Sequence, residues 1–559
     1  MADLPDGVET PRYNLIAAET DRERRAVERA VRPTVTALYV LAAASAAVTV
    51  VLALLAVSRE LRRTRPDQRQ WHLLGVSPPQ RAAVATSPLV LATAGGGIVG
   101  LATAWLLGLG PVGLVEVLER GSSRSLSGRA IWSVGGLVAG VVVAAVAIAV
   151  RSARRTDDLR STATRRQGAL ATLTASTRPV LADGLRAAYS QRSATPVIGG
   201  CATLVGAFVA ALVFGSSLTG LLAAPASYGW PWDVARVTGF GYGGLDLDGA
   251  AALDDDPAVG SWAALGLIND VVLNGEPTLT LVAFDRRSEV DLTLLAGQMP
   301  VRPDEVAVGA TSAADRGLRV GDTVELGGVV PQRRATVTGL VVFPALGAFE
   351  AERLGAGVGL LVSESALGDT FGSELIASVA GVDLESGTAS SRARVQGLLA
   401  PLDMWGFPEV SLARPVRPPE VIGAASTQDV PTAVAGVFAA VTAIGVGFAS
   451  WASVRSRRRD LAVIQALGGQ RRQVRRSIRV QSLATMLASL ALGVPAGVIA
   501  GRVLWRGFAR QLGVVPDAGQ PWGPVLLTVV GALGLALLAA VVPGFLASRA
   551  TPAASLRTE

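Results

Sequence analysis

The chain has 559 residues, of which 50% are apolar and only 17% are charged, and its formal net charge is +7. A mean hydropathy of +0.44 is too high for an ordinary soluble protein and predicts a membrane protein. All 51 basic residues are Arg, and a chain without Lys cannot form the phosphate-binding loop of a P-loop ATPase. One Cys and one His cannot build a disulfide framework or a Cys/His metal cluster within the chain. We therefore expect no catalytic site, no metal, no cofactor and no nucleic-acid partner.

Seven apolar segments have a length that spans a bilayer or comes close to it. They cover residues 34–57, 83–109, 130–150, 194–222, 431–453, 478–504 and 524–548. The fourth segment is rich in Gly, as membrane helices that pack closely often are. Its single Cys201 is expected to be a small core residue.

The distribution of Arg predicts the orientation of these segments. Residues 58–82, 151–193 and 454–477 are rich in Arg, whereas residues 110–129 and 505–523 hold few. The positive-inside rule places the Arg-rich connections and the C-terminal tail in the cytoplasm. We expect a multi-pass plasma-membrane protein whose N-terminus and residues 223–430 lie outside.

Residues 223–430 differ in composition from the rest of the chain, with 27 Asp and Glu against 13 Arg. The stretches DTVELGG, RATVTGLVVF and VGLLVSE predict short strands. TSAADRGL predicts a helix with Thr311 or Ser312 as N-cap and Gly317 near its end. We expect one extracytoplasmic α+β domain with room for two lobes. The run Asp254-Asp255-Asp256 either binds a cation or forms a solvated loop, and the lack of spaced partner carboxylates favours the loop.

An internal repeat appears when the sequence is shifted by 393 positions. Asp67 then falls on Asp460, Leu74-Gly75 on Leu467-Gly468, and Gln80 on Gln473. Each copy has the order span, basic loop, span, outer loop, span. We predict two three-helix copies at residues 34–150 and 431–559. Between them lie a basic cytoplasmic linker at 151–193, a membrane helix at 194–222 and the outer domain at 223–430, and an extracytoplasmic segment at 1–33 precedes the first copy.

The cytoplasmic stretch RSRRRDLAVIQALGGQRRQVRR, residues 455–476, places a short apolar run between arginines. Val463, Ile464 and Leu467 share one helical face, Asp460 favours the helix start, and Gly468-Gly469 favours its end. Such a helix lies on the membrane surface or docks in a partner's groove. A simple positive-inside anchor would explain the arginines but not the apolar stripe.

These residues resemble the C-terminal part of FtsX-like ABC transporter permeases. The resemblance rests on Asp460, on the triplet Ala466-Leu467-Gly468, on the basic patch Arg472-Gln473-Val474 and on the tail 552–557, PAASLR. GQMPVRPDEVAVGATSAADRGLRVGDTVEL, beginning at Gly297, resembles the MacB-like extracytoplasmic core domain of the same permeases.

The resemblance implies a non-catalytic membrane subunit that partners a cytoplasmic ABC-type ATPase, itself a dimer. The coupling helix would contain Asp460, Val463, Ile464, Ala466, Leu467 and Gly468, and a second coupling loop Asp67, Trp71, Leu74 and Gly75. Membrane lipid and an extracytoplasmic substrate or regulatory partner complete the implied contacts.

Two functions stay open. The first is export or extraction of an amphiphile such as a lipid, a lipoprotein or an antimicrobial compound. The alternative is a mechanotransmission subunit that regulates an outer partner, such as a cell-wall hydrolase, without transport. An integral membrane enzyme is disfavoured because no nucleophile, base or metal cluster recurs in the spans. Two-repeat relatives carry a span and an outer domain before the first copy, so residues 1–33 are expected to be the remnant of such a domain in a truncated or reduced first half.

Overall fold

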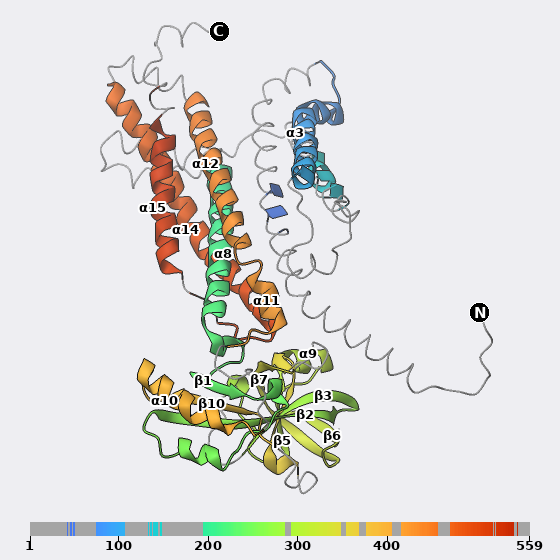
Figure 1. Ribbon diagram of the computed structural model, residues 1–559. Helices are drawn as coiled ribbons and strands as arrows, with labels where there is room; N and C mark the ends of the chain where they lie inside the picture. Colours follow the sequence, from blue (N-terminus) through green and yellow to red (C-terminus); the bar gives the residue numbers. More distant parts are fainter. Residues whose placement is uncertain are drawn as a thin grey trace, which may run out of the picture. The chain divides into compact units, whose positions relative to one another are not determined.

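A computed structural model gives the fold of the chain (Figure 1). It describes residues 74–106, 194–284, 292–347, 354–367, 376–404, 415–456 and 470–541, without residues 518 and 520. It also describes Phe545 and single positions within the ranges 42–50 and 132–147.

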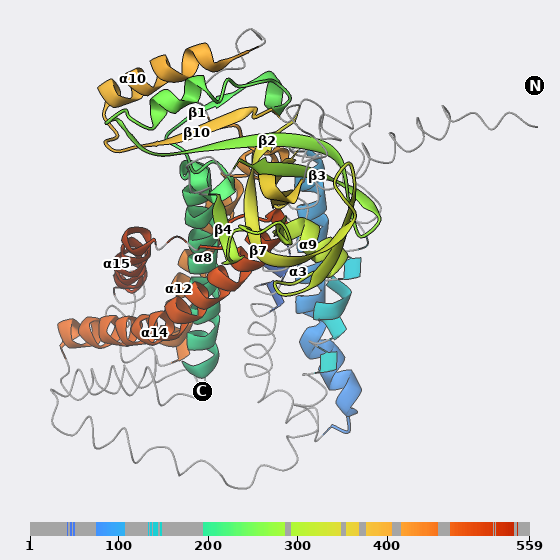
Figure 2. The same cartoon turned by 90° about the horizontal axis from the view of Figure 1, so that it is seen from below.

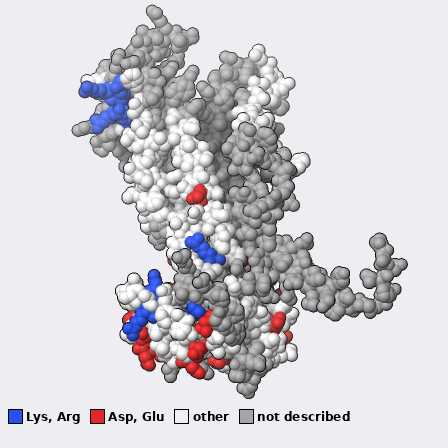
Figure 3. Space-filling model, in the orientation of Figure 1, with Lys and Arg blue, Asp and Glu red and all other residues white. Residues whose placement is uncertain are grey.

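The chain divides into two structural units. Unit 1 contains a β-rich domain and residues 505–518, and unit 2 contains most of the helices. In Figure 3 the described surface of the helices is largely white, whereas acidic side chains gather on the β-rich domain. This contrast fits helices that face an apolar medium and a domain that faces water.

Five long helices account for most of the described helical residues. They are α3 (Pro78–Leu106), α8 (Ala194–Ala223), α12 (Val430–Ser456), α14 (Arg471–Leu512) and α15 (Trp522–Ala539). Among the described residues, three helical stretches are long and apolar enough to cross a membrane: Val197–Ala223, Pro419–Gly445 and Arg472–Leu512. Val90–Ala102 and Trp522–Leu538 are shorter apolar stretches.

These helices coincide with five of the seven expected spans. Most of the segment 34–57 and about half of the segment 130–150 lie outside the described residues, so the expected total of seven stays a prediction. The sixth segment was expected to end at residue 504. Instead α14 is one helix of 42 residues that continues to Leu512, because its Arg-containing final turns remain helical beyond the apolar stretch.

Helices α8 and α14 pack closely through small residues. Gly493, Gly497 and Gly501 recur every fourth residue on α14, and a Cβ on Gly497 would lie 2.5 Å from the carbonyl oxygen of Gly206 in α8. Without side chains between them the two backbones approach directly, as in membrane helix pairs with small residues at this spacing. Cys201, Val205 and Met486 are buried beside this contact, which confirms the expected core position of Cys201.

The described part of the β-rich domain contains ten strands. They are β1 (Val234–Val237), β2 (Val259–Leu273), β3 (Glu276–Ala283), β4 (Thr293–Gly297), β5 (Glu305–Gly309), β6 (Thr323–Gly328), β7 (Arg333–Leu346), β8 (Leu354–Ala356), β9 (Leu360–Ser363) and β10 (Val379–Leu384). The stretches expected to form strands do so as β6, β7 and β9.

Six of these strands close into a ring in the order β2-β3-β9-β5-β7-β6, because β6 pairs with both β7 and β2. One buried cluster combines side chains from all six strands, including Val271, Val306 and Val337. Fully burying such an aliphatic side chain contributes about 1.5–3 kcal/mol. The ring therefore has an apolar core of its own.

A second lobe extends from the same long strand β2. Strand β10 pairs with β2 and β1 pairs with β10, and the helix α10 (Ala389–Leu399) lies along them (Figure 2). Val234, Trp262 and Leu399 belong to a separate buried cluster in this lobe. The β-rich domain thus has two cores joined by β2.

The helix expected over TSAADRGL forms as α9 (Ala310–Arg316) and ends at Gly317 in the left-handed conformation, as expected. The expected N-cap was wrong, because Gly309 occupies that position without a side-chain cap. The hydroxyl of Ser312 instead accepts a hydrogen bond from the backbone N–H of Gly359 at 3.1 Å. The Ser312 hydroxyl, one of the two expected capping groups, is therefore engaged in a contact between distant segments of the chain.

Candidate coupling region and its link to the β-rich domain

The expected coupling residues fall largely outside the described part of the chain. Asp460, Val463, Ile464, Ala466, Leu467 and Gly468 lie there, as do Asp67 and Trp71. Leu74 and Gly75 are described. The structure also describes the starts of α3 and α14, the helices that follow the two expected coupling loops.

Leu74 and Gly75 form a turn ahead of α3. The side chain of Leu74 is 78% exposed, and Gly75 has φ +77°, which favours Gly over any residue with a side chain. Helix α3 then begins at Pro78, where the ring suits a first helical turn. An exposed Leu in front of a helix start is available to a partner.

Both helices that follow the expected coupling loops begin with the same cap. The backbone N–H of Ser77 donates to Oε1 of Gln80 at 3.2 Å, and the backbone N–H of Gln470 donates to Oε1 of Gln473 at 3.0 Å. The two helices begin at Pro78 and Arg471, which are also 393 positions apart. The residues that align in the repeat therefore have the same role at the two helix starts.

The start of α14 packs against the end of α15. Val474 and Ile478 form a small buried cluster with Ala540, while the guanidinium carbon of Arg475 lies 5.2 Å from the ring centroid of Phe545. Such a cation–π contact contributes about 0.5–1 kcal/mol at an exposed site. The exposed side chains of Arg472, Arg476 and Arg479 complete a basic surface on these first turns.

The other end of α14 belongs to unit 1. Trp505 is fully buried and its indole N–H donates to the carbonyl oxygen of Asp517 at 2.7 Å. The backbone N–H of Val515 donates to the carbonyl of Ser227 in the short helix η2 (Pro225–Tyr228). The first hydrogen bond holds the turn after α14 against the helix, and the second attaches that turn to the segment that follows α8.

A contact between two glycines fixes the same turn to the β-rich domain. Gly513 has φ +68°, and a Cβ on it would collide with the backbone of Gly357. Gly357 also receives the N–H groups of Thr311 and Ser312 at its carbonyl, at 2.9 and 3.0 Å. The end of α14 thus touches the loop that links β8, β9 and the start of α9.

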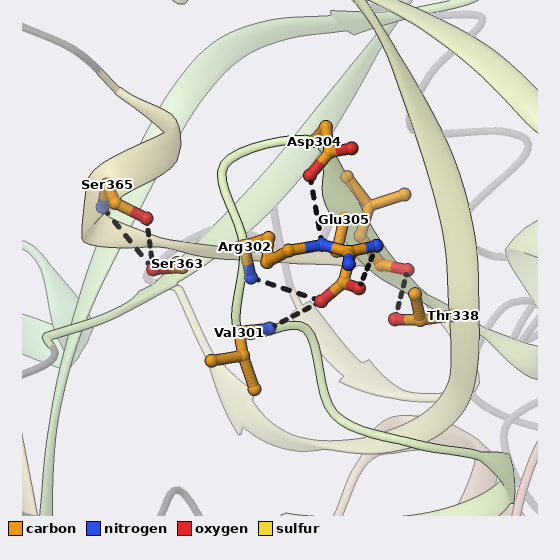
Figure 4. A network of polar contacts seen from close by, with 8 residues as sticks. Val301, Arg302, Asp304, Glu305, Thr338, Ser363 and Ser365 are labelled. Atoms are coloured by element: carbon orange, nitrogen blue, oxygen red, sulfur yellow. Dashed lines mark hydrogen bonds and ion pairs between the residues drawn. The ribbon is translucent and has the colours of Figure 1, made fainter.

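The polar clusters of the β-rich domain act structurally. Glu305 accepts from the backbone N–H groups of Val301 and Arg302 and pairs with the Arg302 guanidinium at 2.9 Å (Figure 4). The two backbone hydrogen bonds are the main cause that holds the pKa of Glu305 below its ordinary value, and the positive charge of Arg302 adds to this effect. They fix the turn before β5.

The acidic run at residues 254–256 is engaged within the domain. Asp254 accepts from the Trp262 indole at 2.9 Å, and Asp256 pairs with Arg394 at 2.7 Å. Among the described residues, no group of three His, Cys, Asp or Glu side chains is arranged to hold a metal ion. Asp254 and Asp255 are exposed, and these contacts favour the loop interpretation of this run over a cation site.

Sequence reasoning missed the two features that join these elements. The length of α14 was hidden because Arg506 and Arg510 follow its apolar stretch. The Gly513–Gly357 contact joins residues 156 positions apart (513 − 357) and has no local signal. The four-residue spacing of Gly493, Gly497 and Gly501 is a sequence signal for a different contact, the close packing of α14 on α8.

Comparison with known proteins identifies the C-terminal part of the chain. Residues 432–552 match the family described as FtsX-like permease C-terminal. The match covers α12, α14 and α15, including the capped start of α14. No curated protein matches the chain.

Proposed function

We propose that this chain, a membrane protein whose residues 432–552 form an FtsX-like permease domain, is the permease subunit of an ABC transporter. A separate cytoplasmic ATPase, present as a dimer, hydrolyses ATP. The permease couples that hydrolysis to the export or extraction of an amphiphile.

The observation that carries this proposal is the continuity of α14. This helix begins three residues after the expected coupling segment Asp460–Gly468 and ends in the contact with the β-rich domain. At 1.5 Å per residue its 42 residues span about 63 Å. Pro495 removes one backbone hydrogen bond inside α14, but the helix continues past it. A displacement of its basic end by an ATPase would therefore be passed along a single helix.

Packing inside unit 2 supports the transmission of such a displacement. The α8–α14 contact is backbone to backbone through Gly206 and Gly497, and Leu204 of α8 packs on Phe438 of α12. Close-packed interfaces resist continuous deformation and transmit strain. We propose that α8, α12 and α14 respond together when the coupling helix is engaged.

The test is co-purification of the chain with its ATPase, followed by ATP hydrolysis measured across candidate amphiphiles in vesicles. We expect the isolated chain to hydrolyse no ATP and the complex to be stimulated by its substrate. Hydrolysis by this chain alone, in a preparation shown to be free of the partner, would contradict the proposal. An ATPase that responds to an outer protein partner and to no amphiphile would instead support mechanotransmission.

The proposed orientation has its own test. Gly327 lies in β6, where an added Cβ meets no atom within 4 Å, so a Cys there is accessible to a membrane-impermeant reagent. Cys201, the single native Cys, is buried. Labelling of intact spheroplasts is expected, and labelling only after lysis would reverse the topology.

A further inference from the structure

Helix α14 carries an exposed stripe opposite its glycines, which we call the outward stripe. It consists of Leu492, Ile499 and Val503, each exposed by 61–64%, followed by the exposed Arg506 and Arg510. Steps of seven, four, three and four residues keep these side chains on one helical face. The stripe is apolar along its length and cationic at one end.

The dimensions of the outward stripe match one leaflet of a bilayer. From Leu492 to Val503 the helix rises by eleven residues, about 16.5 Å, and half of a hydrocarbon core is about 15 Å. Arg506 and Arg510 follow about one and two turns later, on the part of α14 that belongs to unit 1 with the β-rich domain. In the proposed orientation they lie at the depth of the outer headgroups.

The positive-inside rule does not account for these arginines. It favours Arg on the cytoplasmic side and few at the outer ends of spans, yet this outer end carries two exposed guanidinium groups. Within the described part of the chain, neither has a carboxylate at ion-pair distance. Guanidinium groups bind phosphate and carboxylate with paired hydrogen bonds.

We infer that the outward stripe binds an amphiphile with an anionic headgroup, a phosphate or carboxylate lipid from the outer leaflet. Its acyl chain would lie along Leu492, Ile499 and Val503, and its headgroup on Arg506 and Arg510. Binding itself needs no ATPase. The role of this lipid as substrate rests on the proposed function.

A fluorophore beside the two arginines reports this binding directly. Gly507 is exposed and a Cβ there meets no atom within 4 Å, so Gly507→Cys is a suitable labelling position. The labelled full chain is placed in phosphatidylcholine vesicles, and nitroxide-labelled phosphatidylglycerol or phosphatidylcholine is added at equal mole fraction. We expect the phosphatidylglycerol probe to quench at least about threefold more at low salt, since each Arg near a surface attracts anionic lipid.

Two matched double variants separate local binding from general attraction. Arg506→Gln with Arg510→Gln should reduce the quenching ratio to about one, and Arg506→Lys with Arg510→Lys should restore part of it. Arg472→Gln with Arg476→Gln, at the opposite end of the same helix, should leave the ratio unchanged. Equal quenching by the two probes in the unaltered chain would overturn the inference, as would a preference that survives loss of Arg506 and Arg510.

A second measurement addresses the substrate role. In the co-purified complex, phosphatidylglycerol vesicles should stimulate ATP hydrolysis, and the Arg506→Gln, Arg510→Gln variant should lose that stimulation while still binding the ATPase. Quenching without stimulation would overturn the substrate role and leave the binding site. Failure to co-purify any ATPase would contradict the proposed function and not the binding result.

Discussion

The backbone N–H of Gln470 donates to Oε1 of Gln473 at 3.0 Å, and this hydrogen bond occupies one of the N–H groups left open at the start of α14. Gln80 does the same for Ser77 at the start of α3. The same hydrogen bond thus marks the start of α3 and of α14, each directly after one of the two expected coupling loops.

Loss of the cap should loosen the start of α14. Gln473→Ala removes the acceptor, and lost caps cost about 0.5–2 kcal/mol. We expect faster amide hydrogen exchange over residues 470–474 and unchanged exchange in the middle of the helix. Gln473→Glu, which keeps an acceptor, is the matched control, and equal exchange in all three proteins would show that the cap contributes nothing.

The two coupling loops should contribute unequally. Leu467 belongs to a three-residue apolar stripe, whereas Leu74 has only Trp71 beside it before the proline-rich end of the loop. Burying a Leu in a partner's groove contributes about 1.5–3 kcal/mol, and a carboxylate there is unfavourable. Leu467→Asp should abolish ATPase stimulation or complex formation, and Leu74→Asp should weaken it less. An equal or larger loss for Leu74→Asp, with insertion of both variants verified, would identify the first loop as the principal dock.

The glycine contact between α8 and α14 should not tolerate a methyl group. A Cβ on Gly497 would lie 2.5 Å from the carbonyl oxygen of Gly206 and 2.8 Å from Cβ of Val209, so Gly497→Ala must separate the helices. Overpacking of this kind costs about 1–3 kcal/mol. The apparent melting temperature in detergent should fall. Gly507→Ala on the same helix, where a Cβ meets open space, should be neutral or slightly stabilising because Ala favours helix.

Two glycines with the same φ allow the cost of a left-handed backbone to be separated from the cost of a steric clash at the turn after α14. Gly513 and Gly317 both have φ +68°, but only at Gly513 would a Cβ meet other atoms. Gly317→Ala should cost about 1–2 kcal/mol from the left-handed backbone alone. Gly513→Ala should cost more and should also weaken ATPase coupling in the complex. Equal shifts in melting temperature would mean that the Gly513–Gly357 contact adjusts freely.

Acid should weaken the turn before β5. Folding lowers the pKa of Glu305 from 4.5, mainly through the N–H groups of Val301 and Arg302. A depressed folded pKa gives stability that is present above the unfolded pKa and lost as pH falls through the folded one. The protection of the amides of residues 301–309 against exchange, corrected for the slower intrinsic exchange in acid, should therefore fall below about pH 4.5. Glu305→Gln should be less stable at pH 7 and less pH-dependent, whereas Asp304→Asn, with an exposed carboxylate, should behave like the unaltered chain.

Several elements follow from local sequence pattern alone. Apolar length located α8, α12 and α14, because a helix that spans lipid must satisfy its backbone internally. Alternating β-branched residues located β6, β7 and β9. The repeat aligned Gln80 with Gln473, the two residues that cap the starts of α3 and α14. The coupling residues around Leu467 stay predictions, since they lie outside the described chain.

The contacts between these elements depend on packing over long sequence distances. Strand β6 closes the ring by pairing with β2 more than fifty residues away in sequence, and no local pattern specifies that partner. The hydroxyl of Ser312 bonds to the backbone of Gly359 and does not cap its own helix. Gly513 lies against the backbone of Gly357. Each of these contacts depends on the close approach of distant backbones. Local sequence sets the conformation of a segment, whereas the packing of the whole chain selects its neighbours.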